Sequence, residues 1–140
     1  MIEAMRGVLE DRLTHDERVV LLGEDIEDPK GDVFGVTRGL STRFPGRVNN
    51  TALTESTIIG GAIGRSMAGA RPVGFIQFAD FLPNGIGQVM SELGSIYWRT
   101  NGQFECPVIL MVTCGAYRPG LGRSTPTPTR ACWLTSPVST

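Results

Sequence analysis

Two acidic side chains stand out in an apolar, glycine-rich stretch of this sequence. Glu55 follows "NNTALT" and precedes "STIIGGAIGRSMAGA", whose small and apolar residues suit a packed helix, and Asp80 follows "FIQFA". A carboxylate near a helix N-terminus is favoured by the helix dipole, so Glu55 fits ordinary helix entry. No histidine, lysine or metal ligand lies near Glu55 in the sequence. The pattern alone therefore leaves open what a lone carboxyl group does there.

Other polar and aromatic residues follow apolar runs. Glu24 and Asp25 come directly after "RVVLLG", where ligands bind in parallel sheets, although a loop that meets solvent or caps a helix is equally compatible. Gln77 and Phe81 lie in and after "FIQFADF". An amide can orient a flat, polar-edged ligand and an aromatic ring can stack on it. A strand followed by a plain loop explains the same residues, so the pattern does not decide.

The elements that must position these residues alternate along the chain. Helical spacing of apolar residues predicts helices, and short apolar runs ended by glycine or polar residues predict buried strands. Helices are expected over 2–13, 55–70 and 84–98, with a short one beginning within 33–40; strands are expected over 18–26, 71–78 and 106–114, with a weak one over 47–54. This order predicts an α/β fold, with a parallel sheet and helices on both faces.

Glycines within the expected helix 55–70 also carry information. Gly60, Gly64 and Ala68 fall four apart and share one face. A glycine inside a helix costs about 1 kcal/mol relative to alanine, so this face is expected to lie close to a neighbouring element. The stretch "GGAIG" lacks the spacing, and the strong preceding strand, of a dinucleotide-binding fingerprint. An unrelated nucleotide-binding α/β protein nevertheless stays one of the alternative functions.

Composition excludes several classes of protein. The chain has 140 residues, which suits one domain, and a net charge of −1 with 13 basic and 14 acidic residues, which disfavours nucleic-acid binding. Its longest apolar runs have the length of a strand, too short to span a membrane, and its N-terminus does not resemble a signal peptide. We therefore expect a cytoplasmic protein. Three cysteines without CxxC spacing disfavour a disulfide framework and a zinc site. His15 lies among charged residues and is expected at the surface.

The composition changes after Gly122. Residues 123–140 contain 11 Ser, Thr or Pro among 18 and show no helical or strand period, which predicts a disordered, non-homologous tail. A shift of reading frame, or truncation, after about residue 122 is a second hypothesis, which the gene sequence would test. The expected organisation is a domain over 1–122 followed by this tail.

Seven motifs in order carry a resemblance over about residues 1–122: "RVVLLGEDI", "GDVFGVTRGL", "TALTES", "GGAIG", "MAGARPV", "FIQFADF" and "NGQFECPV". Together they resemble the N-terminal, pyrimidine-binding domain of the beta subunit of thiamine-diphosphate-dependent 2-oxo acid dehydrogenases, nearest the branched-chain, acetoin and pyruvate types. The resemblance implies an incomplete transketolase-like α/β fold. It also implies oxidative decarboxylation of a 2-oxo acid with thiamine diphosphate, and transfer of the acyl group to lipoamide. Which 2-oxo acid is used stays open.

The resemblance assigns roles to individual residues. Glu55 matches the acid that pairs with a pyrimidine ring nitrogen and shares a proton with it. Leu53 matches a residue whose backbone lies near that ring, Gln77 a polar contact to it, and Phe81 the aromatic that stacks on it. No metal ligand is expected in this chain, because the alpha subunit of such enzymes holds Mg²⁺ and the diphosphate.

Partners follow from the same resemblance. The expected assembly is a heterotetramer with the alpha subunit and a second beta subunit, and it works with the lipoyl acyltransferase of the complex. Gly60 and Gly64 would let their helix approach a subunit neighbour. Some family members bind a structural potassium ion through backbone carbonyls that match Pro107, Ile109 and Leu110.

The sequence also departs from the family. A histidine expected shortly after "YRPGLG" is missing, and so is the C-terminal domain of the beta subunit. We therefore expect the isolated chain to be inactive. The second function hypothesis is a truncated non-catalytic module that at most docks on an alpha subunit.

Overall fold

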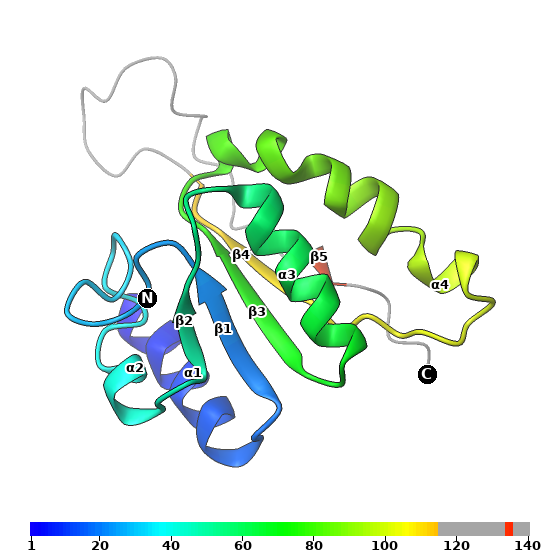
Figure 1. The fold of residues 1–140 in the computed structure, drawn as a ribbon. Coiled ribbons are helices and arrows are strands. Elements are labelled where there is room, and N and C mark those ends of the chain that lie inside the picture. The colour runs from blue at the N-terminus through cyan, green and yellow to red at the C-terminus, as the bar shows by residue number, and fades with distance from the viewer. Residues whose placement is uncertain (115–133, 136–140) are drawn as a thin grey trace.

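The computed structural model describes residues 1–114 and 134–135, and its centre is a twisted β-sheet (Figure 1). The strand order is β2-β1-β3-β4-β5. Neighbours among β1 to β4 are parallel, and β5 pairs antiparallel with β4. The strands are β1 (Val19–Gly23), β2 (Val48–Asn50), β3 (Arg71–Ile76), β4 (Ile109–Val112) and β5 (Leu134–Thr135). The predicted parallel sheet, including the weak strand before Glu55, is therefore confirmed.

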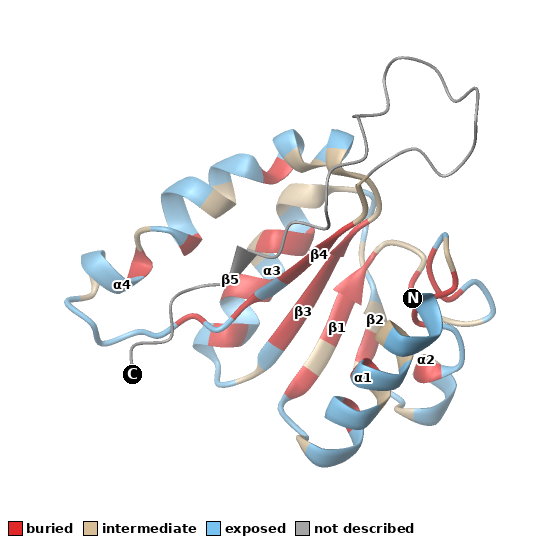
Figure 2. Ribbon diagram, turned by 180° about the vertical axis from the view of Figure 1, so that it is seen from behind, coloured by how far each residue is buried: buried red, intermediate tan, exposed pale blue. Residues whose placement is uncertain are grey.

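Helices cover both faces of the sheet, as the sequence pattern predicted (Figure 1). The helices α1 (Ile2–His15) and α2 (Leu40–Arg43) share one apolar core with the strand residues on the same face of the sheet, such as Leu21. The helix α3 (Glu55–Met67) shares the opposite core with Leu22 and its neighbours. Successive strand residues alternate between two buried cores, which is why the runs are apolar throughout (Figure 2).

The glycines of α3 do not pack closely within the described chain. A Cβ atom built on Gly64 meets nothing within 4 Å, and one on Gly60 meets only the Gln88 side chain at 3.8 Å. The close approach occurs instead at Gly74 of β3, where a Cβ would lie 3.1 Å from Leu110 Cδ2 and 3.5 Å from Ile58 Cγ2. Contact of the outer α3 face with another subunit stays a prediction.

The helix expected over 84–98 is divided into separate pieces. They are the 3₁₀ helix η1 (Ala79–Gly85), the π-helical turn η2 (Gln88–Leu93) and α4 (Ile96–Arg99). Pro83 inside η1 lacks an N–H for regular helical bonding. At the end of η2 the Gly94 N–H donates to the carbonyl oxygen of Val89 at 2.8 Å, the wider spacing of a π-helix. The periodicity correctly identified the buried Leu93 and Ile96 but not the break in the helix.

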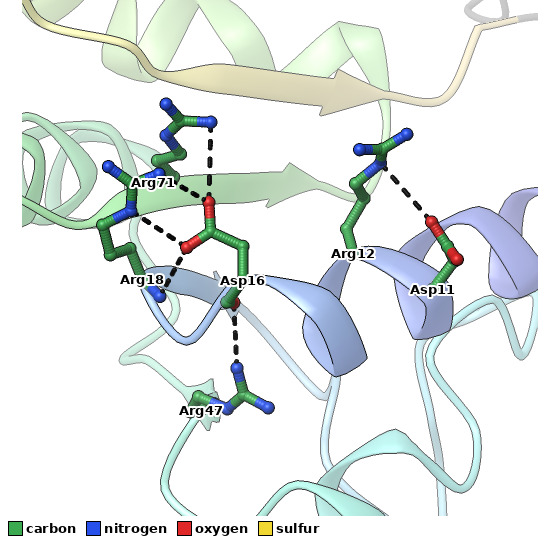
Figure 3. A network of polar contacts seen from close by, with 6 residues as sticks. All are labelled: Asp11, Arg12, Asp16, Arg18, Arg47 and Arg71. Atoms are coloured by element: carbon green, nitrogen blue, oxygen red, sulfur yellow. Dashed lines mark hydrogen bonds and ion pairs between the residues drawn. The ribbon is translucent and has the colours of Figure 1, made fainter.

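A polar network lies at the amino-terminal ends of the strands (Figure 3). The Asp16 carboxylate, just after α1, accepts hydrogen bonds from the backbone N–H and the guanidinium of Arg18 at 2.9–3.0 Å. Arg71, the first residue of β3, lies 3.5 Å from the same carboxylate, and Arg47 donates to the Asp16 carbonyl oxygen at 3.1 Å. The hydrogen bonds from Arg18, followed by the charges of Arg18 and Arg71, lower the pKa of Asp16 from 3.8 to about 2.

A second carboxylate organises the loop between β1 and α2. Asp28 accepts hydrogen bonds from the Gly39 N–H at 2.6 Å, the Ser41 hydroxyl at 2.8 Å, and the Thr42 hydroxyl and N–H at 2.7 and 3.1 Å. These donors hold the pKa of Asp28 well below its usual range, the Gly39 N–H contributing most. Asp28 thereby caps α2, which begins at Leu40, at the end of the segment where a short helix was expected.

Several smaller expectations can be compared with the structure. His15 is exposed, as predicted. Cys106 is buried and Cys114 is partly buried, both as free thiols, and Cys132 lies outside the described residues. The proposed boundary at residue 122 and the tail lie outside them too, apart from β5. Within the described part of the chain, no helix has the length and apolar character needed to span a membrane.

Candidate functional site

The strand order creates a topological switch point at the carboxyl end of the sheet, between β1 and β3. The chain leaves β1 toward β2 on one side and leaves β3 toward β4 on the other, while β1 and β3 are neighbours, with Gly23 opposite Phe75. Ligands in open parallel sheets bind where connections diverge in this way. Glu24 directly follows β1, and Gln77 directly follows β3. The fold therefore places two of the sequence candidates at this switch point.

Glu55 is the first residue of α3, and the segment before it is bonded to the end of β1 through the Thr51 N–H and the Gly23 carbonyl oxygen at 2.9 Å. The preceding Thr54 has an extended backbone, with φ −160° and ψ 116°, so the helix begins at Glu55 itself. Its side chain is half-buried, and Asn84 Nδ2 donates a hydrogen bond to Glu55 Oε2 at 3.3 Å. The other oxygen, Oε1, has no hydrogen-bond partner among the described residues. Glu55 thus presents one open carboxyl oxygen.

Glu24 and Gln77 contact each other at the strand ends. Gln77 Nε2 donates to the Glu24 carbonyl oxygen at 3.5 Å, a long and weak hydrogen bond. The pKa of Glu24 is raised, first by burial and then by the negative charges of Asp25 and Glu55, while Lys30 opposes the shift. The repulsion from Glu55 means that the two carboxyl groups lie within electrostatic range. Glu24 therefore belongs to the same cluster as Glu55, which the sequence pattern alone left undecided.

Asp25 follows Glu24 in the chain, and its charge contributes to the raised pKa of Glu24. It has a left-handed backbone, with φ 55°, and its carboxylate pairs with Lys30. Asp80, the other acidic residue that stood out in the sequence, is exposed and has no hydrogen bond or ion pair within residues 1–114. Within residues 1–114, neither carboxylate has a hydrogen bond or ion pair with Glu55.

Two apolar side chains near Glu55 are exposed. Leu53, two residues before it, is 74% exposed, and Phe81 of η1 is 41% exposed. The Phe81 ring packs edge-on against Phe78, with 5.8 Å between centroids, and Phe78 packs in the same way against Phe34 at 5.9 Å. Exposed apolar groups beside an open carboxyl oxygen suit a flat ligand with apolar faces and one polar edge.

The sequence did not identify Asn84 and Gly85 as site residues. They fell within an expected helix, although "PNG" is a turn signal that could have marked them. Gly85 is buried against α3: a Cβ there would lie 2.5 Å from Ile59 Cδ1 and 3.1 Å from the backbone of Glu55. This contact brings Asn84 to the Glu55 carboxylate.

Metal binding has little support in the described residues. No three His, Cys, Asp or Glu side chains within them are arranged to hold a metal ion. Ile109 and Leu110 form the start of β4, and Pro107 precedes it. A potassium site on their backbone carbonyls stays a prediction.

Comparison with known proteins identifies a family for this chain. Residues 1–126 match the family described as transketolase, pyrimidine binding domain. The chain is 39% identical over 115 residues to the 2-oxoisovalerate dehydrogenase subunit beta of Bacillus subtilis, a match that covers 81% of this chain and 35% of that protein. It is 39% identical over 118 residues to the pyruvate dehydrogenase E1 component subunit beta of Leifsonia xyli, covering 84% and 35%.

A third relative is named for a different substrate. The acetoin:2,6-dichlorophenolindophenol oxidoreductase subunit beta of Cupriavidus necator is 32% identical over 122 residues, covering 81% of this chain and 36% of that protein. The chain thus spans about a third of the length of these curated relatives.

Proposed function

The chain belongs to the transketolase pyrimidine-binding domain family, as its motifs predicted, and from that premise we propose that it is the pyrimidine-binding part of a 2-oxo acid dehydrogenase beta subunit. Its cofactor would be thiamine diphosphate, with Glu55 on the pyrimidine. The observation that carries the proposal is the open Oε1 oxygen of Glu55 at the switch point of the sheet.

The residues around this oxygen fit an aminopyrimidine. The ring has two apolar faces and a basic nitrogen at its edge. The site offers exposed Leu53 and Phe81, together with one carboxyl oxygen that has no partner among the described residues. Phe81 would stack on a ring face. Gln77 would turn its amide to a polar ring edge, because its present bond to the Glu24 carbonyl is long and easily replaced.

Glu55 would hold and move one proton. Placed at the ring nitrogen, its carboxyl group would share a proton with that atom, which is general acid–base chemistry at a single hydrogen bond. When bound, thiamine diphosphate supplies the activated carbon that attacks the 2-oxo acid carbonyl and allows CO₂ to leave. This chain's own contribution is to bind, orient and exchange a proton with the pyrimidine.

The remaining parts of the enzyme would come from partners. An alpha subunit would hold the diphosphate through Mg²⁺, a second beta subunit would complete a heterotetramer, and a lipoyl acyltransferase would accept the acyl group. The relatives' names as beta subunits support an alpha partner. The isolated chain would then show no turnover. The 2-oxo acid would be pyruvate, a branched-chain acid or an acetoin-type substrate.

The experiment that tests this proposal uses the chain co-assembled with an alpha subunit. Glu55→Gln should slow hydrogen–deuterium exchange at C2 of bound thiamine diphosphate by about 10²-fold or more, the usual contribution of a positioned acid–base group. The control is Glu92→Gln, at an exposed glutamate paired with Arg99 in the following helical segment, which should leave exchange unchanged. Equal exchange in the parent and in Glu55→Gln would overturn the assignment.

A further inference from the structure

We propose that Asn84 is a positioning residue for Glu55, and that it determines which of the two carboxyl oxygens carries the proton that Glu55 shares with its ligand. This inference rests on the proposed function, because it concerns the same carboxyl group. Asn84 comes from η1, 29 residues beyond Glu55, and its amide Nδ2 lies 3.3 Å from Glu55 Oε2.

The position of Asn84 is fixed by its neighbour rather than by its own exposed side chain. Gly85 is buried, and its Cα lies so close to α3 that an added Cβ would be 3.1 Å from both the carbonyl carbon and the carbonyl oxygen of Glu55. The backbone of residue 85 therefore packs on the same residue whose side chain Asn84 contacts. The register between Asn84 and Glu55 follows from this packing.

The hydrogen bond from the Asn84 amide affects where a proton can reside on the Glu55 carboxyl group. An amide N–H only donates, so the oxygen that it contacts must accept. In a neutral carboxyl group, one oxygen carries the proton and donates, while the other accepts. With Oε2 engaged by Asn84, the proton of a neutral Glu55 resides on Oε1, which has no partner among the described residues. Asn84 thus directs the proton toward the open side of the site.

Other charged groups around Glu55 do not replace this function. Glu24 is the carboxyl group within electrostatic range of Glu55, and it repels the ionised form without offering a donor. Lys30 is engaged by Asp25. Among the described residues, Asn84 supplies the hydrogen-bond donor that distinguishes the two oxygens of Glu55.

The test uses the full 140-residue chain labelled with ¹³C and ¹⁵N, in four forms: parent, Asn84→Ala, the isosteric Asn84→Asp, and a matched control, Asn49→Ala. The Asn49 amide donates to the Gly46 carbonyl oxygen at 3.2 Å, so the control loses a bond of the same type without a carboxylate partner. Before any ligand is added, the Glu55 carboxyl resonance should shift in both Asn84 variants and stay in place in Asn49→Ala. An unchanged resonance in Asn84→Ala would overturn the inference.

The second measurement is a titration with thiamine diphosphate of each form co-assembled with an alpha subunit. Asn84→Ala should weaken binding about three- to tenfold, the value of one ordinary hydrogen bond. Asn84→Asp should weaken it further, because the donor becomes an acceptor, and Asn49→Ala should stay within about twofold. Equal binding by parent and Asn84→Ala would overturn the inference while leaving the proposed function intact. Failure of the parent assembly to bind counts against the proposed function, and the carboxyl resonance still decides the role of Asn84.

Discussion

The backbone of Gly85 lies against the backbone of Glu55, where α3 begins. A Cβ atom built on Gly85 would be 3.1 Å from the carbonyl carbon and oxygen of Glu55, and 2.5 Å from Ile59 Cδ1. The methyl end of Ile59 can move, but the first turn of α3 is held by the sheet beneath it. The geometry around the candidate carboxyl group therefore depends on a glycine from a different element.

Gly85→Ala should destabilise the chain by about 1–3 kcal/mol, because overpacking against a fixed backbone forces η1 away from α3. The same displacement should separate Asn84 from Glu55, so that the affinity for thiamine diphosphate falls together with stability. Urea unfolding and ligand titration of the same sample measure both effects.

The control for this variant is Gly87→Ala, the same substitution two residues further on. A Cβ on Gly87 meets nothing within 4 Å, and its φ of −58° is helical. Alanine there should leave stability unchanged or raise it by up to about 1 kcal/mol, since alanine is the better helix former. Equal losses at both positions would show that close packing at residue 85 is not the cause.

Asp16→Asn should change how the chain responds to acid. The pKa of Asp16 is lowered from 3.8 to about 2, mainly by its hydrogen bond with Arg18, so the ionised carboxylate favours the folded state. That contribution is fully present above pH 3.8 and is lost as the pH falls toward 2. The variant should therefore be less stable than the parent at pH 7, with the difference shrinking toward pH 2, and high salt should reduce it because the side chains of Arg18 and Arg71 are exposed.

Chemical denaturation at pH 7, 4 and 2 measures this effect. Asp80→Asn is the matched control, because the Asp80 carboxylate has no hydrogen bond or ion pair in the described part of the chain. Its stability should follow that of the parent at each pH. A constant difference between Asp16→Asn and the parent across the whole range would mean that the network in Figure 3 does not act through the charge of Asp16.

Sequence patterns predicted the layers of this fold because they report which residues are buried. In β1 and β3, the residues that face either core are apolar. In α3, buried apolar residues recur at helical spacing from Ile58 to Ile63. Alternation of strands and helices then requires a parallel sheet with both faces covered. The position of Glu24 at a strand end follows from the same reasoning.

The patterns could not give contacts between distant residues or the type of helical turn. Leu93 and Ile96 have the same burial in an unbroken helix as in a π-turn followed by a short helix, so their spacing did not reveal the break. Which glycine makes a close approach depends on tertiary packing: Gly64 faces open space, while Gly85 packs on α3. The roles of Leu53, Gln77 and Phe81 came from resemblance and stay predictions.

Glu24→Gln should stabilise the chain at neutral pH. Burial and the nearby negative charges, including that of Glu55, raise the pKa of Glu24 above 4.5, so the folded state favours its neutral form. The unfolded chain ionises Glu24 at its ordinary pKa, so folding loses stability as the pH rises past 4.5. Glutamine imitates the neutral carboxyl group, which predicts a higher unfolding midpoint than the parent at pH 7 and an equal one near pH 4.

A double-mutant cycle shows whether this effect acts through Glu55. Part of the cost of ionising Glu24 comes from repulsion by Glu55, so Glu24→Gln should stabilise less in a Glu55→Gln background than in the parent. Glu92→Gln is the contrasting variant, because the exposed Glu92 pairs with Arg99 in another part of the chain and its loss should not stabilise the chain. If Glu24→Gln lowered stability at pH 7, or acted equally in both backgrounds, the two carboxyl groups would not form one electrostatic cluster, and Glu24 would be an ordinary loop residue after β1.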